Sequence, residues 1–237
     1  MLTKYIRRTK AMYIILIIAA LIFSVVASIK VKTTYAKYDG ITVRCGMTSN
    51  ECARRVMTEG GVSDVAISAV SGSLTDNYNP KTRTLSLSDS TRGKTTVGAI
   101  GVAAHEAGHA VQHSQGYSFL ALRAAMVPVV NIGSNIGIIL CIIGMLLGLA
   151  GSFLTGAGIA LYSLTFLFTL ITLPVEFNAS RRAITAIKGM GCFDESEIKG
   201  MEQVLKAAAM TYVASMASAL ANLLRIIAIF GGRNRRR

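Results

Sequence analysis

The chain has 237 residues, of which 52% are hydrophobic and 16% are charged. Soluble domains carry about 25% charged residues, so the composition excludes an ordinary aqueous protein, and its hydrophobicity excludes a disordered one. The net charge is +13, but the basic excess lies mainly in two acid-free tails, residues 1–11 and 231–237, beside apolar segments. Such tails are typical of cytoplasmic anchors, and no nucleic-acid-binding motif accompanies the charge. The composition therefore predicts a membrane protein that contacts the lipid bilayer and binds no nucleic acid.

Four segments are long and apolar enough to cross a bilayer, which takes roughly 20 residues. They are residues 11–29, 127–149, 153–173 and 208–230. The first also resembles a secretory signal cleaved near Ala27, but its apolar stretch is longer than that of a signal and favours an uncleaved anchor. The second and third are joined by Ala150-Gly151-Ser152, so we expect a helical hairpin whose outer ends lie on one side of the membrane.

The polar stretch between the first two spans predicts a small α+β unit. A helix is expected to begin at Thr48-Ser49-Asn50-Glu51, which has the residue types of an N-terminal cap, and to end at Gly60. Residues 62–70 alternate apolar and polar, as a half-buried strand does. Residues 74–78 and 84–88 flank a turn-like insert and predict a β-hairpin.

The next predicted helix starts near Thr96 and contains His105, Glu106 and His109 in the pattern H-E-x-x-H. Helical residues four apart lie on one face, so the two imidazoles can bind one zinc ion, and Glu106 can take a proton from a water on that ion. All three histidines of the chain lie on this segment, which argues against ordinary core histidines. The third, His113, lies about 12 Å along the helix from His105, too far to share one ion. It is expected either at the margin of the site or as a cation near the helix end.

A catalytic zinc ion needs three protein ligands and an open position for water. No histidine remains, so the third ligand must be a carboxylate or another oxygen, and Glu176 is the candidate. Pro174 is expected to end the third span or to open the next helix, which would place Glu176 in a first helical turn. Two spans separate His109 from Glu176, so both are expected on one side of the membrane. From spacing alone, Glu176 is equally compatible with an acid that stabilises a helix N-terminus.

The four cysteines carry little functional signal, because no C-x-x-C spacing is present. Cys45 and Cys52 are seven residues apart and would pair if their loop faced an oxidising compartment. Free thiols are the favoured interpretation.

Several stretches together resemble the YugP-like neutral zinc metallopeptidases, membrane relatives of the H-E-x-x-H…E gluzincins. The stretches are LTDNYNP at 74–80, GVAAHEAGHAVQH at 101–113, LRAAMVPVVNIG at 122–133, LPVEFNASRRA at 173–183 and TYVA at 211–214. The resemblance covers nearly the whole chain. It implies that His105 and His109 are zinc ligands, that Glu106 is the general base and that Glu176 is the third ligand.

The resemblance also includes one departure. Membrane gluzincins carry E-x-x-A-D from the third ligand onward, and the aspartate falls on Ser180 here, so its support of the metal ligands is weakened or passes to Asn178. Candidates for stabilising the oxyanion are Tyr212, Arg181 and Tyr78, although packing or surface solvation is the more ordinary interpretation of each. Residues 84–88 are expected at a sheet edge, where an extended substrate could add a strand.

The sequence thus predicts a mainly α membrane protein with about four transmembrane helices and a small α+β zincin-like catalytic unit that carries the H-E-x-x-H helix. Five segments are expected: 1–29, a basic tail and anchor; 30–125, the α+β unit with the zinc helix; 126–174, a helical hairpin; 175–207, a helix with the third ligand and a connector; and 208–237, a span and basic tail.

The predicted activity is that of an integral-membrane zinc endopeptidase with one catalytic zinc ion, in which a zinc-activated water attacks the peptide bond and Glu106 is the base. Its substrates would be proteins or peptides, including membrane-associated ones. The alternative is a catalytically silent membrane protein with a structural zinc site, but such a site has no need of Glu106. A transporter has poor support, because no predicted span carries an acidic residue in its middle.

The basic tails and the even number of spans favour cytoplasmic termini in a multi-pass protein of the cell membrane, with the catalytic site outside. Basic residues also flank the other ends of the spans, so the difference in charge between the two sides is small. The sequence names neither a specific substrate nor an oligomeric state.

Overall fold

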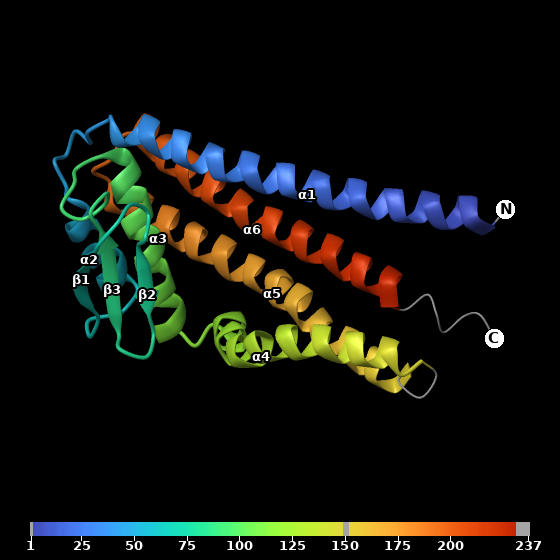
Figure 1. Cartoon of the computed structure of the whole chain (residues 1–237). Coiled ribbons are helices and arrows are strands. Elements are labelled where there is room, and N and C mark those ends of the chain that lie inside the picture. Colours follow the sequence, from blue (N-terminus) through green and yellow to red (C-terminus); the bar gives the residue numbers. More distant parts are fainter. Residues whose placement is uncertain (1, 149–151, 231–237) are drawn as a thin grey trace. The chain divides into compact units, whose positions relative to one another are not determined.

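The computed structural model describes residues 2–148 and 152–230. In these ranges the elements are α1 (Leu2–Asp39), α2 (Ser49–Glu59), β1 (Ala66–Val70), β2 (Asn77–Asn79), β3 (Thr84–Ser88), α3 (Val97–Ser114), α4 (Ser118–Leu146), α5 (Ser152–Met190) and α6 (Glu195–Phe230) (Figure 1). The chain divides into two compact units. The helical unit consists of Met1–Val26, Leu122–Leu173 and Thr211–Arg237, and the mixed unit consists of Ala27–Ala121 and Pro174–Met210.

The described ranges hold four helices that are long and apolar enough to cross a membrane, which agrees with the number of predicted spans. They are Met12–Asp39, Ser118–Leu146, Phe153–Met190 and Glu195–Phe230. Each helix is longer than the span predicted within it, because all four extend into the mixed unit. Only 6% of the most apolar window of α1 is buried, and its large side chains, such as Ile15 and Leu21, are exposed. A helix with so much bare apolar surface fits a lipid environment.

Within the helical unit, α4 and α5 touch through glycines. A Cβ atom on Gly137 would lie 2.8 Å from the carbonyl oxygen of Gly158, too close for any other residue. Small residues of this kind let membrane helices approach closely. The close contact agrees with the predicted hairpin, but most of the predicted connection, at positions 149–151, lies outside the described residues.

The sheet of the mixed unit has the order β1-β3-β2, with β1 parallel and β2 antiparallel to β3. The predicted hairpin is therefore confirmed, but its first strand begins only at Asn77. Before it, Leu74 has a positive φ of 56°, and the Asp76 carboxylate accepts a hydrogen bond from the Ser88 backbone N–H at 2.8 Å. At residues 74–76, the turn at Leu74 and the hydrogen bond of Asp76 therefore take the place of backbone pairing between strands. Similarly, β1 covers only the second half of the predicted strand at 62–70.

The prediction that residues 84–88 form a sheet edge is wrong. β3 lies in the centre of the three described strands because β1 pairs along its other side. Leu85 and Leu87 of β3 are completely buried, so this strand gains more from two partners than an edge strand would. The edges of the sheet are β1 and β2.

The helix caps of the mixed unit follow the sequence prediction. At the start of α2, the Thr48 side chain accepts from the backbone N–H of Glu51, and the Glu51 carboxylate accepts from the Thr48 N–H at 2.8 Å. This is a complete capping box, and Gly60 ends the helix as predicted. Thr96 caps the start of α3. Helix α3 lies against the sheet and α2 (Figure 1).

The core of the mixed unit fixes α3 relative to α5 and α6. Its largest fully buried side chains come from different elements: Leu85 and Leu87 of β3, Ile100 of α3, Ile187 of α5 and Met201 of α6. Since protein interiors are close-packed, these contacts leave α3 and α5 little freedom to shift against each other.

The prediction that Pro174 ends or opens a helix is wrong, because α5 continues through it to Met190. Glu176 therefore lies inside a long helix rather than in a first turn. A proline inside a helix costs about 3 kcal/mol. Burial of the following turns offsets this cost, since Val175, Ala179 and Ala183 are all fully buried. The stretch 175–207 thus contains the end of α5 and the start of α6.

Candidate metal centre

The structure brings His105, His109 and Glu176 together inside the mixed unit. The histidines lie one turn apart on α3, and Glu176 comes from α5. Glu176 Oε2 lies 3.2 Å from His105 Nε2 and 3.5 Å from His109 Nε2. The donor atoms of all three residues lie within 4.8 Å of one another, and this is the cluster of metal donors found in the described part of the chain.

The separations of these atoms fit a tetrahedral zinc ion. Two ligand atoms at the usual zinc distances of about 2.0–2.1 Å are about 3.3 Å apart when the angle between them is tetrahedral. The observed 3.2 Å and 3.5 Å lie on either side of this value. Two imidazoles and one carboxylate are also a donor set used by catalytic zinc sites, which keep a fourth position for water. The residues present therefore fit the ion.

Each histidine has a polar partner at its other ring nitrogen. Ser180 Oγ lies 3.1 Å from His105 Nδ1, and Gln112 Oε1 lies 2.9 Å from His109 Nδ1. When each Nδ1–H donates to its oxygen partner, the Nε2 lone pair is free to bind a metal. Ser180 thus contacts the site directly, whereas Asn178 contacts Gln112 through its Oδ1 atom at 2.9 Å.

Sequence reasoning missed Gln112. The residue follows His109 by three positions, a spacing that places side chains on one helix face, and this was the signal available in the sequence. Its side chain is fully buried. Its partner Val175, whose carbonyl accepts from Gln112 Nε2 at 2.8 Å, lies 63 residues away in the chain. A contact over that separation has no local sequence signature.

Glu106 follows His105 on α3 and is partly buried. Burial raises the pKa of its carboxyl group above the ordinary value, while the neighbouring His105 and His109 act in the opposite direction. A carboxylate with a raised pKa binds a proton more readily, which suits proton transfer near neutral pH. Its role as general base remains a prediction.

His113 and Tyr78 form a pair that links α3 to the edge strand β2. The Tyr78 hydroxyl lies 2.8 Å from His113 Nδ1, and burial raises the pKa of the Tyr78 phenol. His113 is not a member of the donor cluster found in the described residues, as its distance along the helix predicted. Tyr212 belongs to the helical unit, so its role toward the oxyanion remains a prediction.

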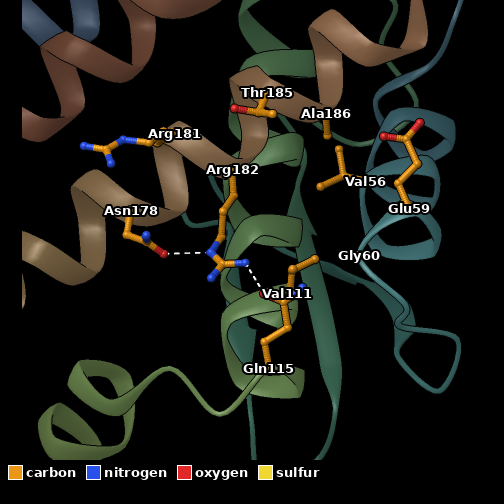
Figure 2. A pocket seen from close by; sticks show the side chains of 10 residues that line it. All are labelled: Val56, Glu59, Gly60, Val111, Gln115, Asn178, Arg181, Arg182, Thr185 and Ala186. Carbon is orange, nitrogen blue, oxygen red and sulfur yellow. Dashed lines mark hydrogen bonds between the residues drawn. The ribbon is translucent and has the colours of Figure 1, made fainter.

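A groove of about 360 Å³ lies between α2, α3 and α5 in the mixed unit. Figure 2 shows Arg182 inside it, donating from Nε to Asn178 Oδ1 at 2.7 Å and from its guanidinium to Gln115. Arg181, a candidate from the sequence, also lines this groove. Asn178 therefore contacts Arg182 at the groove and Gln112 beside His109.

All four cysteines are free, so Cys45 and Cys52 are not paired. Cys45 is exposed, whereas Cys52 is buried in α2, and burial raises the pKa of its thiol to about 12. A thiol with so high a pKa is almost never the reactive thiolate at neutral pH. Cys52 is therefore a packing residue.

Two comparisons with known proteins bear on this site. Residues 13–231 match a protein family described as "Putative neutral zinc metallopeptidase". The chain is also similar to "Putative membrane protease YugP" of Bacillus subtilis (strain 168), with 44% identity over 219 residues that cover 92% of this chain and 96% of that protein. No solved structure matches the chain.

Proposed function

The chain belongs to the neutral zinc metallopeptidase family, and on this premise we propose that it is an integral-membrane zinc endopeptidase. The observation that carries the proposal is the geometry of the donor cluster, in which Glu176 Oε2 lies 3.2 Å and 3.5 Å from the Nε2 atoms of His105 and His109. The four apolar helices support its place in a membrane. The relative's name as a membrane protease agrees with both features.

The roles of the residues follow from their chemistry. One zinc ion held by His105, His109 and Glu176 would polarise the scissile carbonyl and lower the pKa of a water molecule to about 7. Glu106 accepts a proton from the attacking water and returns it to the leaving amine. Ser180 accepts a hydrogen bond from His105 and keeps its ring in place.

The alternative is a silent protein whose zinc is structural. Such a site is usually closed by four protein ligands, whereas this cluster offers three and leaves a position for water. A structural zinc site would also not need the carboxylate of Glu106 as a proton acceptor. The enzyme is therefore the better-supported proposal.

The test is the substitution Glu106→Gln, which keeps the shape of the side chain and removes its ability to accept a proton. We expect kcat/KM toward an unstructured protein substrate to fall by about 10²–10⁴-fold. Zinc content and melting temperature should stay close to those of the parent, measured on the full chain in detergent. The matched control is Glu195→Gln, whose carboxylate is exposed and pairs with Lys199.

Loss of activity in the Glu106 variant alone would support a general base. Equal activity in the parent and the Glu106 variant would reject that role. A parent that binds zinc but cleaves nothing would favour the structural alternative.

The finer features of the protein in its membrane are also proposals. The tails of the chain are basic and flank apolar helices, so the termini would face the cytoplasm and the mixed unit would lie outside the cell membrane. The substrates would be proteins or peptides, including those held in or near the bilayer. We propose no role in nucleic-acid binding, because the basic charge is explained by the tails.

A further inference from the structure

Gln112 is a polar side chain with no exposed surface, and it lies between the two helices that carry the metal donors. From α3 it contacts His109 of its own helix and two residues of α5. Its Oε1 atom lies 2.9 Å from His109 Nδ1, and its Nε2 atom lies 2.8 Å from the Val175 carbonyl oxygen and 2.9 Å from Asn178 Oδ1. Both the oxygen and the nitrogen of the Gln112 amide therefore have hydrogen-bond partners.

These contacts fix which way the amide faces. The Val175 carbonyl oxygen can only accept a hydrogen bond, so the amide nitrogen of Gln112 must face it. The amide oxygen must then face His109 Nδ1, and an oxygen of this type can only accept. The contact is satisfied only if Nδ1 carries the proton. His109 then has a free lone pair on Nε2, the atom that lies 3.5 Å from Glu176 Oε2.

We propose that Gln112 is a positioning residue, which holds His109 in the metal-binding tautomer and ties it to the segment of α5 that carries Glu176. Val175 directly precedes Glu176. The Gln112 amide therefore orients the ring of His109 and also holds the backbone next to Glu176. The inference rests on the zinc site of the proposed function, but not on the activity of that site.

The contacts of Asn178 strengthen this arrangement. Its Oδ1 atom accepts from both Gln112 Nε2 and Arg182 Nε, at 2.9 Å and 2.7 Å. The Arg182 guanidinium also donates to Gln115, which caps the C-terminus of α3 (Figure 2). The buried amide is thus held from α5 as well as from its own helix. A buried polar network of this kind favours one geometry over others, because any other orientation leaves a group without its partner.

The experiment measures the zinc dissociation constant of the full chain in detergent by competition with a chelator. Gln112→Met keeps the approximate shape of the side chain and removes both the acceptor and the donor. We expect its zinc Kd to rise by about 10–100-fold, the usual effect of losing a partner of a metal ligand. The control Gln203→Met removes an exposed amide of α6, and its Kd should stay within about twofold of the parent.

A second variant tests whether an acceptor oxygen beside His109 is what supports zinc binding. Gln112→Glu keeps the approximate shape of the side chain and keeps an oxygen that can accept a hydrogen bond from His109 Nδ1–H. We expect its Kd to lie within about threefold of the parent. The visible absorption of bound Co²⁺, which reports the geometry of the ligands, should match the parent in the Glu variant and differ in the Met variant.

Two outcomes would overturn the inference. One is a Gln112→Met variant that binds zinc as tightly as the parent. The other is a Glu variant that binds zinc no better than the Met variant, since an acceptor oxygen beside His109 would then contribute nothing to zinc binding. A parent that binds zinc tightly without cleaving a substrate would count against the proposed function alone.

Discussion

His105 and His109 have the same place in the donor cluster but different supports. His109 contacts an amide oxygen that is itself held from two sides, whereas His105 contacts the hydroxyl of Ser180 at 3.1 Å. In the E-x-x-A-D pattern of the membrane gluzincins that the sequence resembles, an aspartate would stand at position 180. A carboxylate raises the basicity of an imidazole ligand more than a hydroxyl does. The hydroxyl of Ser180 therefore gives His105 weaker support than a carboxylate at the same position would give.

The Glu51 carboxylate shows how one exposed residue makes local stability depend on pH. Hydrogen bonds from the backbone and side chain of Thr48 lower the pKa of Glu51 below its ordinary value of 4.5. A group whose pKa is lower in the folded state stabilises it at pH values above the unfolded pKa. That contribution is lost as the pH falls through the lower, folded value.

We expect Glu51→Gln to lower the melting temperature of the protein above about pH 5, where the parent capping box is charged. The difference between the two proteins should shrink as the pH falls below about 4. Thermal unfolding followed by circular dichroism at several pH values measures this. A difference that stays constant down to acidic pH would show that the charge of Glu51 is unimportant.

At the scale of elements, the close approach of α3 and α5 decides whether the donors meet. A Cβ atom on Gly108 of α3 would lie 2.6 Å from the carbonyl oxygen of Ala179 of α5, a backbone atom that cannot move alone. Gly108 directly precedes His109 and Ala179 lies three residues after Glu176. The absence of a side chain at Gly108 therefore sets the distance between the helices at the metal centre.

We predict that Gly108→Ala pushes α3 and α5 apart. Overpacking of this kind costs about 1–3 kcal/mol, and zinc affinity should fall with it because Glu176 moves away from the histidines. The control is Gly101→Ala on the same helix, where the new Cβ would lie 3.4 Å from the Met201 side chain, an ordinary contact. The measurements are the melting temperature and the zinc Kd. Zinc binding that is unchanged in Gly108→Ala would contradict this account.

At the scale of the whole molecule, the proposed orientation in the membrane can be tested by asking which side the mixed unit faces. The mixed unit carries an exposed thiol, Cys45, in the loop between α1 and α2. We expect a membrane-impermeant maleimide to label Cys45 in intact cells, because the proposed orientation places the mixed unit outside. Labelling is read by mass spectrometry, with Cys45→Ser as the control. Labelling only after the cells are permeabilised would show the opposite orientation, with the mixed unit in the cytoplasm.

The sequence by itself determined the features that depend on near neighbours. The four apolar segments, the capping box at Thr48 and the H-E-x-x-H helix after Thr96 all rest on patterns within a few turns, and the structure contains them. Hydrophobic length and helical spacing are local properties, so they can be read without knowing the fold. The choice of Glu176 also came from the sequence, through topology and family resemblance.

Only the tertiary structure decided the features that depend on distant partners. Pro174 lies within α5 because the buried turns after it offset the cost of the proline, and β3 lies at the centre of the sheet because β1 pairs with it. The partner Gln112 at His109 emerges in the same way, and so does the contact of Ser180, rather than Asn178, with His105. Each of these features depends on a balance between a local conformational preference and contacts with residues that are distant in the sequence. That balance is settled only when the core has packed, because burial then outweighs the local terms.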